Sequence, residues 1–514
     1  MNATIRKRMK DRERRLARRL DKMNFPDNLD QPMMRSANLE FELAGRAVGT
    51  CHGGIGLVHQ LVQELGLAEA IDRRLHLFKF HLPYHESDHV LNLAYNALCG
   101  GTCLEDLELR RQDEAYLNIL GAGRIPDPTT AGDFCRRFAR EHVEQLWAAI
   151  DEARRKIWAR QPAEFLAEAR IEADGTMVET GAECKQGIDI SYQGVWGYHP
   201  LALTLANTGE TLRLVNRSGN RPSHEGAAEQ FDQCIALCRG AGFQKILLRG
   251  DTDFSQTKHL DGWHEQGNVR FIFGYDCTDR LHVDADDLPN SAWKPLERAA
   301  RYEVKTQTRA KPARVKQQVV EARGFKDIQQ VDEWVAEMPY RPVACRHTYR
   351  LIVLRKNLRV NDPGQGRIFD DYRYFFYITN DACLTPAEVV FSSNDRCNQE
   401  NHLAQLKAVR ALHAPVDNLL SNEAYMVMTA LAWNLKAWLA LRLPETPGRG
   451  REQRRARKQK LLKLEFRTFV NSWLQIPCQV LKTGRKLVCR LLAWNEWQET
   501  FFHLAEQFRY PLRC

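Results

Sequence analysis

Two aspartates stand where buried strands are expected to end, a position that suits metal chemistry. Asp174 closes a short apolar segment in IEADGT, and Asp251 follows the run KILLRG in LLRGDTDF. A carboxylate at the junction of a strand and its loop is held by a rigid scaffold and still opens to solvent. Two such groups on neighbouring strands offer the oxygen ligands that a hard divalent cation prefers. The ordinary alternative is that each aspartate caps a turn or a helix.

Each of these aspartates has an acidic neighbour that could take its role. Asp253 lies two residues beyond Asp251, and Glu172 shares a strand face with Asp174 because residues two apart point the same way. We favour Asp251 because it directly follows the apolar strand and the Arg-Gly pair. We favour Asp174 because it adjoins the turn-forming Gly175.

A third carboxylate occurs in NDRCNQENHLAQLK, where Arg396, Glu400 and Lys407 follow one another at spacings of four and seven. At about 100° per residue, the three positions fall within roughly 40° of one another on one helical face. An acid with a cation one turn before it and another two turns after it can form a surface ion-pair row. The functional alternative is a face that adds one carboxylate to a metal pair and brings two cations to phosphate groups.

The elements that must position these residues follow the order of an RNase H-like α/β core. A meander of three strands is followed by a helix and then by strands that alternate with helices, which predicts a mixed sheet with flanking helices. The expected strands cover 169–174, 198–206, 211–216, 245–251, 269–275 and 374–380, and the expected helices cover 227–239, 256–266 and most of 386–443.

The rest of the chain divides around this core. Residues 276–372 are polar at first and then contain strand-like pieces at 301–307 and 349–356, which predicts a mainly β subdomain inserted into the core. The helical pattern before the core suits a helix-turn-helix-like DNA module and equally a plain helical bundle. The expected divisions are a basic arm and linker (1–50), a helical DNA-binding region (51–160), the first part of the catalytic core (161–275), the β-rich insertion (276–372), the second part of the core with the Glu400 helix (373–443), and a basic linker with a helical tail (444–514).

Charge distribution favours a polyanionic partner. The 514 residues carry a formal net charge of +9, but residues 1–22 and residues 449–463 each carry +7 on their own. Two short basic tracts on a slightly acidic body are typical of a protein that contacts nucleic acid.

Other classes of protein are disfavoured. The most apolar long window, 425–443, contains Asn434, Lys436 and Arg442, so a buried helix is expected rather than a membrane span. No apolar stretch follows the basic start, which argues against a secretory signal. The 14 cysteines include no CxxC pair, which favours reduced cysteines in a cytoplasmic protein over a zinc site.

The order strand-Asp, strand-Asp, insertion, helix-Glu resembles that of DDE-type insertion-sequence transposases with an RNase H-like catalytic core. Within that group, the chain resembles the class with a Tyr-x2-Arg-x3-Glu-x6-Lys signature, and most of all the IS thirteen-eighty family. Arg396, Glu400 and Lys407 match the signature, while Ser393 stands at the tyrosine position. The second aspartate of the family usually lies in a sequence such as RGDSGF, which reads RGDTDF here. The resemblance covers about residues 50–440.

The resemblance implies a metal-dependent reaction on DNA. Asp174, Asp251 and Glu400 would be the catalytic carboxylates and would bind two Mg²⁺ ions, or Mn²⁺. Two such ions stabilise the attacking and the leaving oxygen of an in-line displacement at phosphorus. Arg396 and Lys407 would hold DNA phosphates next to the site.

The resemblance also implies the partners. They would be double-stranded DNA, both the element ends and the target, and a second copy of the chain in a synaptic complex associated with the nucleoid in the cytoplasm. Two alternatives remain at this point: a transposase-derived, sequence-specific DNA-binding protein without cleavage, and an RNase H-like nuclease that only hydrolyses.

Overall fold

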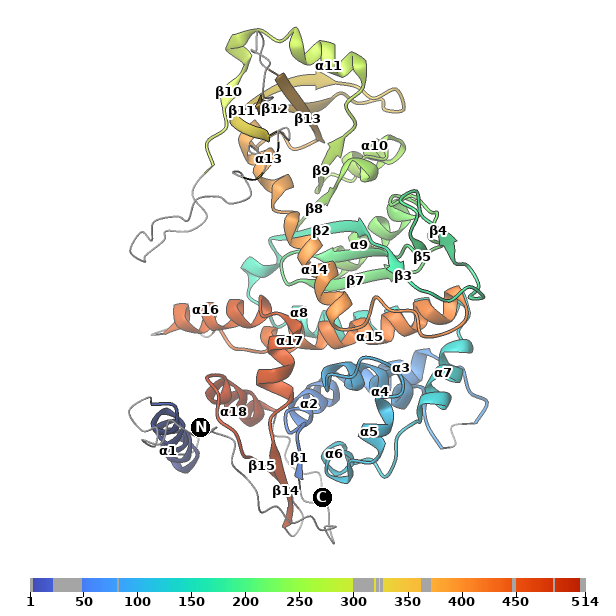
Figure 1. Ribbon diagram of the computed structural model, residues 1–514, viewed down its shortest axis with the longest axis vertical. Coiled ribbons are helices and arrows are strands. Elements are labelled where there is room, and N and C mark those ends of the chain that lie inside the picture. The colour runs from blue at the N-terminus through green and yellow to red at the C-terminus, as the bar shows by residue number, and fades with distance from the viewer. Residues whose placement is uncertain are drawn as a thin grey trace.

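A nine-stranded mixed sheet runs through the upper half of the molecule (Figure 1). The computed structural model describes residues 3–21, 49–80, 83–298, 319, 323, 327–361, 371–445, 450–483 and 486–508. The sheet has the order β10-β11-β12-β13-β9-β8-β2-β6-β7, in which β2–β8 and β8–β9 are parallel and the other pairs are antiparallel. The strands are β2 (Glu168–Gly175), β6 (Leu201–Leu205), β7 (Glu210–Val215), β8 (Lys245–Gly250), β9 (Val269–Tyr275), β10 (Lys294–Pro295), β11 (Asp327–Tyr340), β12 (Tyr349–Asn361) and β13 (Asp371–Thr379).

Helices cover both faces of this sheet because its central strands are apolar on both sides. On one face, Phe273 of β9 contacts the aromatic rings of Phe231 and Trp263. On the other face, Ile272 packs with Val389 in a separate apolar cluster. The covering helices are α9 (Ala227–Gly240) and α10 (Thr257–Glu265) on the first face and α13 (Pro386–Asn394) on the second, and α13 leads directly into α14 (Cys397–Ala408).

The β-rich segment extends the central sheet, whereas the sequence predicts it as an inserted subdomain. β13 pairs with β9 of the core, and β12 and β11 follow as the next strands of the same sheet. Leu351 and Val353 of β12 join the main core, while Ile352 and Leu354 join the cluster on the opposite face. A strand buried on both faces belongs between two helical layers, which accounts for the continuation. The strand predicted at 301–307 lies outside the described residues.

A buried helix, α15 (Leu419–Leu441), lies between the sheet and the helices of the lower half. It packs against β7 on one side and against α4 and α8 on the other (Figure 1). The region predicted to be helical at 51–160 is therefore packed onto the core. Its helices are α2 (Ile55–Leu65), α3 (Leu67–Arg74), α4 (Glu86–Leu98), α5 (Leu107–Arg111), α6 (Glu114–Leu120), α7 (Pro128–Arg136) and α8 (Arg140–Trp158). In the described part of the chain, no helix has the length and apolarity needed to span a bilayer.

The predicted basic linker and helical tail at 444–514 is wrong in two places. First, the basic tract forms a helix, α16 (Arg451–Leu462), which packs on α15 because Leu461 and Leu462 are buried. Second, the tail contains a hairpin of β14 (Cys478–Thr483) and β15 (Lys486–Leu491), because Cys478 and Val480 alternate along one strand face and pack on Ala115. Helical parts remain in α17 (Phe466–Phe469) and α18 (Gln498–Gln507).

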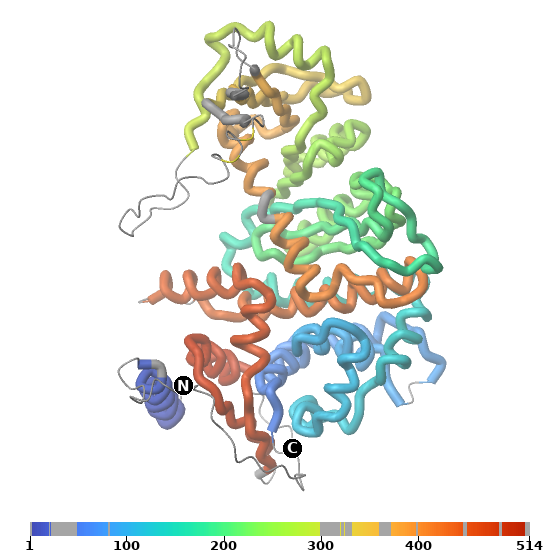
Figure 2. Tube along the Cα trace, viewed as in Figure 1, coloured from blue at the N-terminus to red at the C-terminus, as the bar shows by residue number. Residues whose placement is uncertain are grey.

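The two ends of the described chain meet in this lower half. β1 (Gly49–Thr50) pairs with β14, so that the blue and red parts of the trace lie side by side (Figure 2). The N-terminal basic tract forms α1 (Ala3–Leu20), and Nη1 of Arg12 donates to the carbonyl oxygen of Leu491 at 3.2 Å. Most of the predicted linker between α1 and β1 lies outside the described residues.

Lys436 on α15 gives the fold a measurable dependence on pH. Its side chain is buried, and its Nζ donates to the carbonyl oxygen of Leu462 at 2.8 Å. Burial lowers the pKa of Lys436 from its ordinary value to about 7. Between pH 7 and about pH 10.4, the ordinary lysine pKa, Lys436 binds more protons in the unfolded chain than in the folded chain. The free energy of unfolding therefore rises with pH over this range.

We therefore expect Lys436→Met to raise the melting temperature near neutral pH. The advantage over the wild type should shrink as the pH approaches about 10, where the unfolded lysine also loses its proton. Thermal unfolding of both proteins at several pH values measures this difference. A difference that does not change with pH would contradict the prediction.

Candidate functional site

Asp174 and Asp251 lie at the same edge of the sheet. Asp174 is near the end of β2, and Asp251 directly follows β8, which runs parallel beside β2. Parallel neighbours bring their carboxyl ends to one edge. The Nη1 atom of Arg396 lies 3.7 Å from Oδ2 of Asp174 and 3.9 Å from Oδ2 of Asp251. The two carboxylates therefore share one positive charge.

Glu400 opens into the same place from α14. A cavity of about 540 Å³ is lined by Asp251, Ser393, Arg396 and Glu400. Arg396 has helical dihedral angles directly before α14, so Glu400 follows it by one helical turn. Aromatic residues of β9 and β13 also line the cavity, namely Tyr275, Tyr372, Tyr374, Phe375, Phe376 and Tyr377.

The carboxylates of the site repel one another in a partly desolvated place. Burial raises the pKa of Asp174 to about 6, Arg396 opposes this shift, and the charges of Asp251 and Glu400 add to it. Burial also raises the pKa of Asp251, again opposed by Arg396 and supported by Asp253. Such a cluster of acids favours a bound cation, because a cation removes the repulsion.

The two rival acids occupy different surroundings. Glu172 is buried and forms an ion pair with Arg249, the residue opposite it on β8. Nη1 of Arg249 also donates to the carbonyl oxygen of Ser392 at 2.6 Å. Asp253 is exposed, is not part of the cavity wall, and donates its backbone N–H to Oδ1 of Asp251 at 3.1 Å.

Two of the predicted site residues, Asp174 and Lys407, do not line the cavity. Asp174 still faces Arg396, which does line it, whereas Lys407 lies away from the site. It lies exposed in the last turn of α14, two turns beyond Glu400. The first turn of α14 is anchored to the sheet by Gln399, which accepts a hydrogen bond from Thr204 Oγ1 and donates to the carbonyl oxygen of Ala202 at 3.4 Å. The face that carries Glu400 is therefore held in a fixed orientation over β2 and β6.

Sequence analysis did not identify the Glu172–Arg249 pair or the aromatic residues of the cavity. Arg249 was visible as the first letter of RGDTDF, but its partner depends on the register of β2 against β8. The sequence FFYITN predicted the strand β13, but it did not predict that aromatic residues of this strand would line the same cavity as Glu400.

The donor chemistry of the site fits a hard divalent cation. Asp174 and Asp251 face one shared cation, which is the guanidinium group of Arg396, and Glu400 lines the same cavity. Carboxylate oxygens are the ligands that Mg²⁺ and Mn²⁺ prefer. Among the described residues, no three of His, Cys, Asp or Glu stand close enough together to form a ready metal cluster.

Comparison with known proteins gives a match to a family model and matches to chains of known structure. The family model described as "Transposase DDE domain group 1" matches residues 31–509. No curated protein sequence matches the chain. Seven chains of known structure match. One comes from a cryo-EM structure of a piggyBac transposase synaptic complex with hairpin DNA, with 9% sequence identity, coverage of 82% of this chain and 84% of that chain, and a TM-score of 0.35.

Proposed function

The chain belongs to the transposase DDE domain group 1 family and is a DDE transposase, and we propose that it cuts DNA at the ends of a bacterial insertion sequence and joins the freed ends to a target. The reaction has two stages. Water first attacks the phosphodiester at each element end and releases a 3′-hydroxyl group. That hydroxyl group then attacks a phosphodiester of the target and expels another 3′-hydroxyl group, so the number of phosphodiester bonds is conserved in the second stage.

The observation that carries this proposal is the convergence of acids from distant segments. Asp174 and Asp251 come from adjacent strands and share one cation, and Glu400 lines the same cavity from a helix about 150 residues further along the chain. The raised pKa of Asp174 supports a site that needs a cation for its carboxylates to be ionised together.

Asp174, Asp251 and Glu400 would hold the metal, Mg²⁺ or Mn²⁺ as two ions. When bound, these ions would stabilise charge on the attacking and leaving oxygens of the phosphoryl transfer. The carboxylates would hold the ions at the edge of the sheet, and the scissile phosphate would be held there by the positive charge of the ions. The guanidinium group of Arg396 would be released from the aspartates and could then hold a phosphate oxygen through two parallel hydrogen bonds.

Lys407 would act at a distance from the reacting phosphate. Its exposed place at the end of α14 suits a neighbouring phosphate of the backbone. Double-stranded DNA is thus both the substrate and the main partner, and two copies of the chain would hold the two inverted repeats of the element together on chromosomal DNA in the cytoplasm.

A cleavage and strand-transfer assay tests the proposal and its two alternatives. Purified protein, Mg²⁺, a labelled duplex carrying one element end and a supercoiled target plasmid are combined. The proposal predicts nicks at the end and covalent products with the plasmid. Cleavage without joining would instead indicate a hydrolytic nuclease, and binding without cleavage would indicate a transposase-derived DNA-binding protein.

Asp253→Asn should leave cleavage largely intact. Asp253 is exposed and outside the cavity wall, whereas Asp251 lines the wall and faces Arg396. The same assay is run on Asp253→Asn and on the matched variant Asp251→Asn. Each variant removes one carboxylate charge, and the two positions are only two residues apart, so the comparison shows which aspartate is the metal ligand. Loss of cleavage in Asp253→Asn, with activity kept in Asp251→Asn, would move the metal ligand to Asp253.

A further inference from the structure

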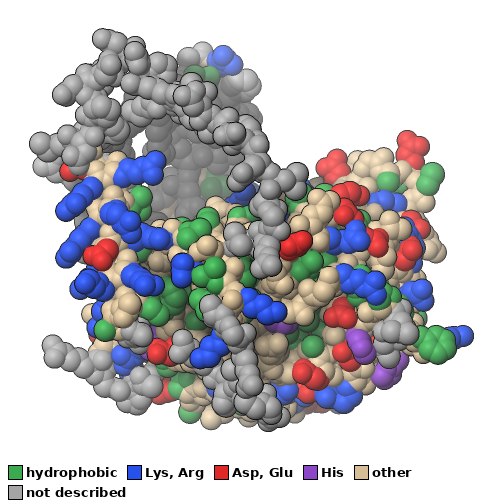
Figure 3. All heavy atoms as spheres, turned by 90° about the horizontal axis from the view of Figure 1, so that it is seen from below, with side chains coloured by type: hydrophobic (Ala, Val, Ile, Leu, Met, Phe, Trp, Pro, Cys, Tyr) green, Lys and Arg blue, Asp and Glu red, His purple; other side chains and the backbone are tan. Residues whose placement is uncertain are grey.

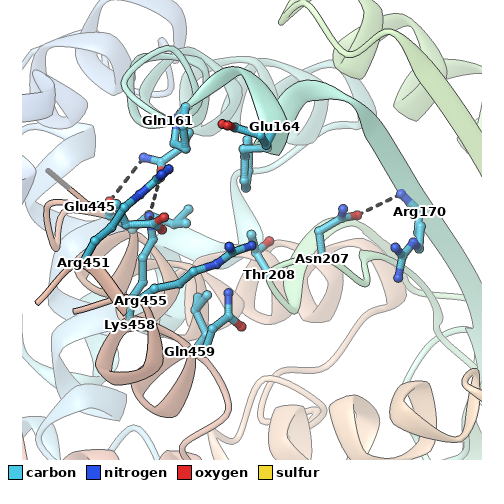
Figure 4. Close-up of a pocket in the computed structure, with 14 residues that line it drawn as sticks. Gln161, Glu164, Arg170, Asn207, Thr208, Glu445, Arg451, Arg455, Lys458 and Gln459 are labelled. Carbon is cyan, nitrogen blue, oxygen red and sulfur yellow. Dashed lines mark hydrogen bonds and ion pairs between the residues drawn. The ribbon is translucent and has the colours of Figure 1, made fainter. Parts of the chain in front are cut away.

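A second hollow, separate from the catalytic cavity, has the chemistry of an anion site. It has a volume of about 410 Å³ and shares no lining residue with the catalytic cavity. Its walls come from β2, from the turn between β6 and β7, from the chain that follows α8, from the end of α15 and from α16 (Figure 4). The polar residues used below are Gln161, Arg170, Glu445, Arg451, Arg455 and Lys458.

The cations of α16 are used differently on its two sides. On the side toward α18, Lys460 pairs with Glu496 at 3.0 Å, and Arg457 Nε donates to Oγ1 of Thr500 at 2.5 Å. On the side toward the hollow, Arg451 and Arg455 lie one turn apart, and Figure 4 shows both side chains extending from the helix into the hollow. Within the described part of the chain, neither side chain has an ion pair or a hydrogen bond.

Lys458 fixes the position of these two arginines. Its side chain is buried, its Nζ lies 2.8 Å from Oε1 of Glu445, and it donates to Oε1 of Gln161 at 2.7 Å. These contacts tie α16 to the end of α15 and to the chain that follows α8. Arg451 and Arg455 are therefore presented by a helix that is already packed, so a ligand would not have to order the helix.

Two further observations favour a phosphate ligand. α16 begins after Gly450, which has no side chain to accept hydrogen bonds from the first amides of the helix, and a helix N-terminus favours an anion. Arg170, on the opposite wall, adds a third guanidinium group to the hollow. Its side chain pairs with Glu168 but remains 49% exposed. Arginine binds phosphate oxygens with two parallel hydrogen bonds, and carboxylates of the hollow are outnumbered by its cations.

We propose that this hollow binds phosphates of the duplex DNA backbone outside the catalytic cavity, an inference that rests on the proposed action on DNA. A long polyanion fits better than a small one, because Arg451 and Arg455 are exposed to solvent and belong to a tract, 449–463, with a net charge of +7. Lysine and arginine side chains gather along the left edge of the face seen from below (Figure 3), the side on which α1 and α16 lie in Figure 1. The hollow would hold flanking DNA while the element end lies at Asp174 and Asp251.

The test compares two double variants of the full chain that remove the same charge from the same helix. R451Q/R455Q changes the side toward the hollow, and R454Q/K460Q changes the side toward α18, where Arg454 lines a different pocket with Arg457. Binding of a fluorescent duplex is measured by anisotropy at several salt concentrations. R451Q/R455Q should bind about tenfold more weakly at low salt, and the slope of log affinity against log salt should become shallower by about 2, since each phosphate contact contributes roughly 0.9.

The control and a conservative variant make the result decisive. R454Q/K460Q should bind within about twofold of the wild type, and R451K/R455K should keep the salt slope of the wild type because it keeps both charges. Equal losses in the two glutamine variants, or no loss in R451Q/R455Q, would overturn the proposal. Binding of inorganic phosphate to the wild type but not to R451Q/R455Q, with equal duplex affinity in the two proteins, would assign the hollow to a small anion instead.

Failure of this inference can be told apart from failure of the proposed function. If the wild type cuts and joins DNA but R451Q/R455Q binds the duplex as the wild type does, the hollow is not a DNA site and the transposase function stands. If the wild type binds DNA through Arg451 and Arg455 but never cuts it, the hollow stands and the proposed cleavage falls.

Discussion

Glu400→Gln is expected to abolish DNA cleavage and to leave DNA binding intact. The substitution keeps the shape of the side chain that lines the catalytic cavity and removes its charge. A neutral amide is a poor ligand for a hard divalent cation, and the positive charge of Arg396 cannot replace a ligand. We expect cleavage to fall by about a thousandfold or more, as when a central stabilising group of a phosphoryl or acyl transfer is lost. Single-turnover cleavage of a labelled element end, with anisotropy on the same duplex, measures both quantities.

Lys407→Ala is the matched comparison on the same helix. Lys407 lies outside the cavity, so its loss should weaken cleavage far less than the loss of Glu400 and should make the salt dependence of DNA binding shallower by about 1. Full cleavage by Glu400→Gln would sink the proposed mechanism, because the described wall of the cavity offers only Asp251 and Asp276 as other acids, and neither comes from α14.

Two core strands, at 245–250 and 269–275, were predictable because the pattern that marks each of them is local in the sequence. The runs KILLRG and VRFIFGY are short, apolar and followed by a polar turn, and both are confirmed as β8 and β9. β8 pairs in parallel with β2, and β9 pairs in parallel with β8. The first of these pairings brings Asp174 and Asp251 to one edge of the sheet.

The parts of the fold that escaped prediction depend on packing. The basic tract of α16 was predicted as a linker from its charge, but its residues are good helix formers, and the burial of Leu461 and Leu462 packs the helix on α15. The hairpin of β14 and β15 has one buried face of two residues, Cys478 and Val480, and a second strand that is mostly exposed. A pattern this short is ambiguous in a sequence, because tertiary contacts decide it.

In the candidate site, too, local features were predictable from the sequence and long-range contacts were not. Glu400 and Arg396 could be placed on one helical face from their spacing, because helical geometry is fixed. The role of Glu172 could not be seen in this way. It shares a strand face with Asp174, but its partner Arg249 is 77 residues away and meets it only through the register of two parallel strands. That contact decides which of the two candidate acids, Glu172 or Asp174, is available to the site.

The Glu172–Arg249 pair should have the largest effect on stability of any single contact near the site. Both side chains are almost fully buried, at 1% and 3% exposure. Burial raises the pKa of Glu172, with Arg249 opposing the shift, so the ionised carboxylate depends on its partner. Glu172→Gln or Arg249→Met alone leaves one buried group without its counter-charge. We expect either to lower the free energy of unfolding by about 3–5 kcal/mol, measured by denaturant unfolding.

The double variant Glu172→Met/Arg249→Met separates stability from positioning. Replacing both buried charges with apolar side chains of similar volume should restore most of the stability, since such replacements are often neutral or favourable. It does not restore the hydrogen bond from Arg249 to the carbonyl oxygen of Ser392, near the end of α13, which holds the junction that leads to Arg396 and Glu400. A small shift of that junction should slow cleavage by roughly tenfold to a hundredfold while DNA binding persists. Cleavage at the wild-type rate by a stable double variant would show that the pair holds the sheet together and does not position the helix that carries Glu400.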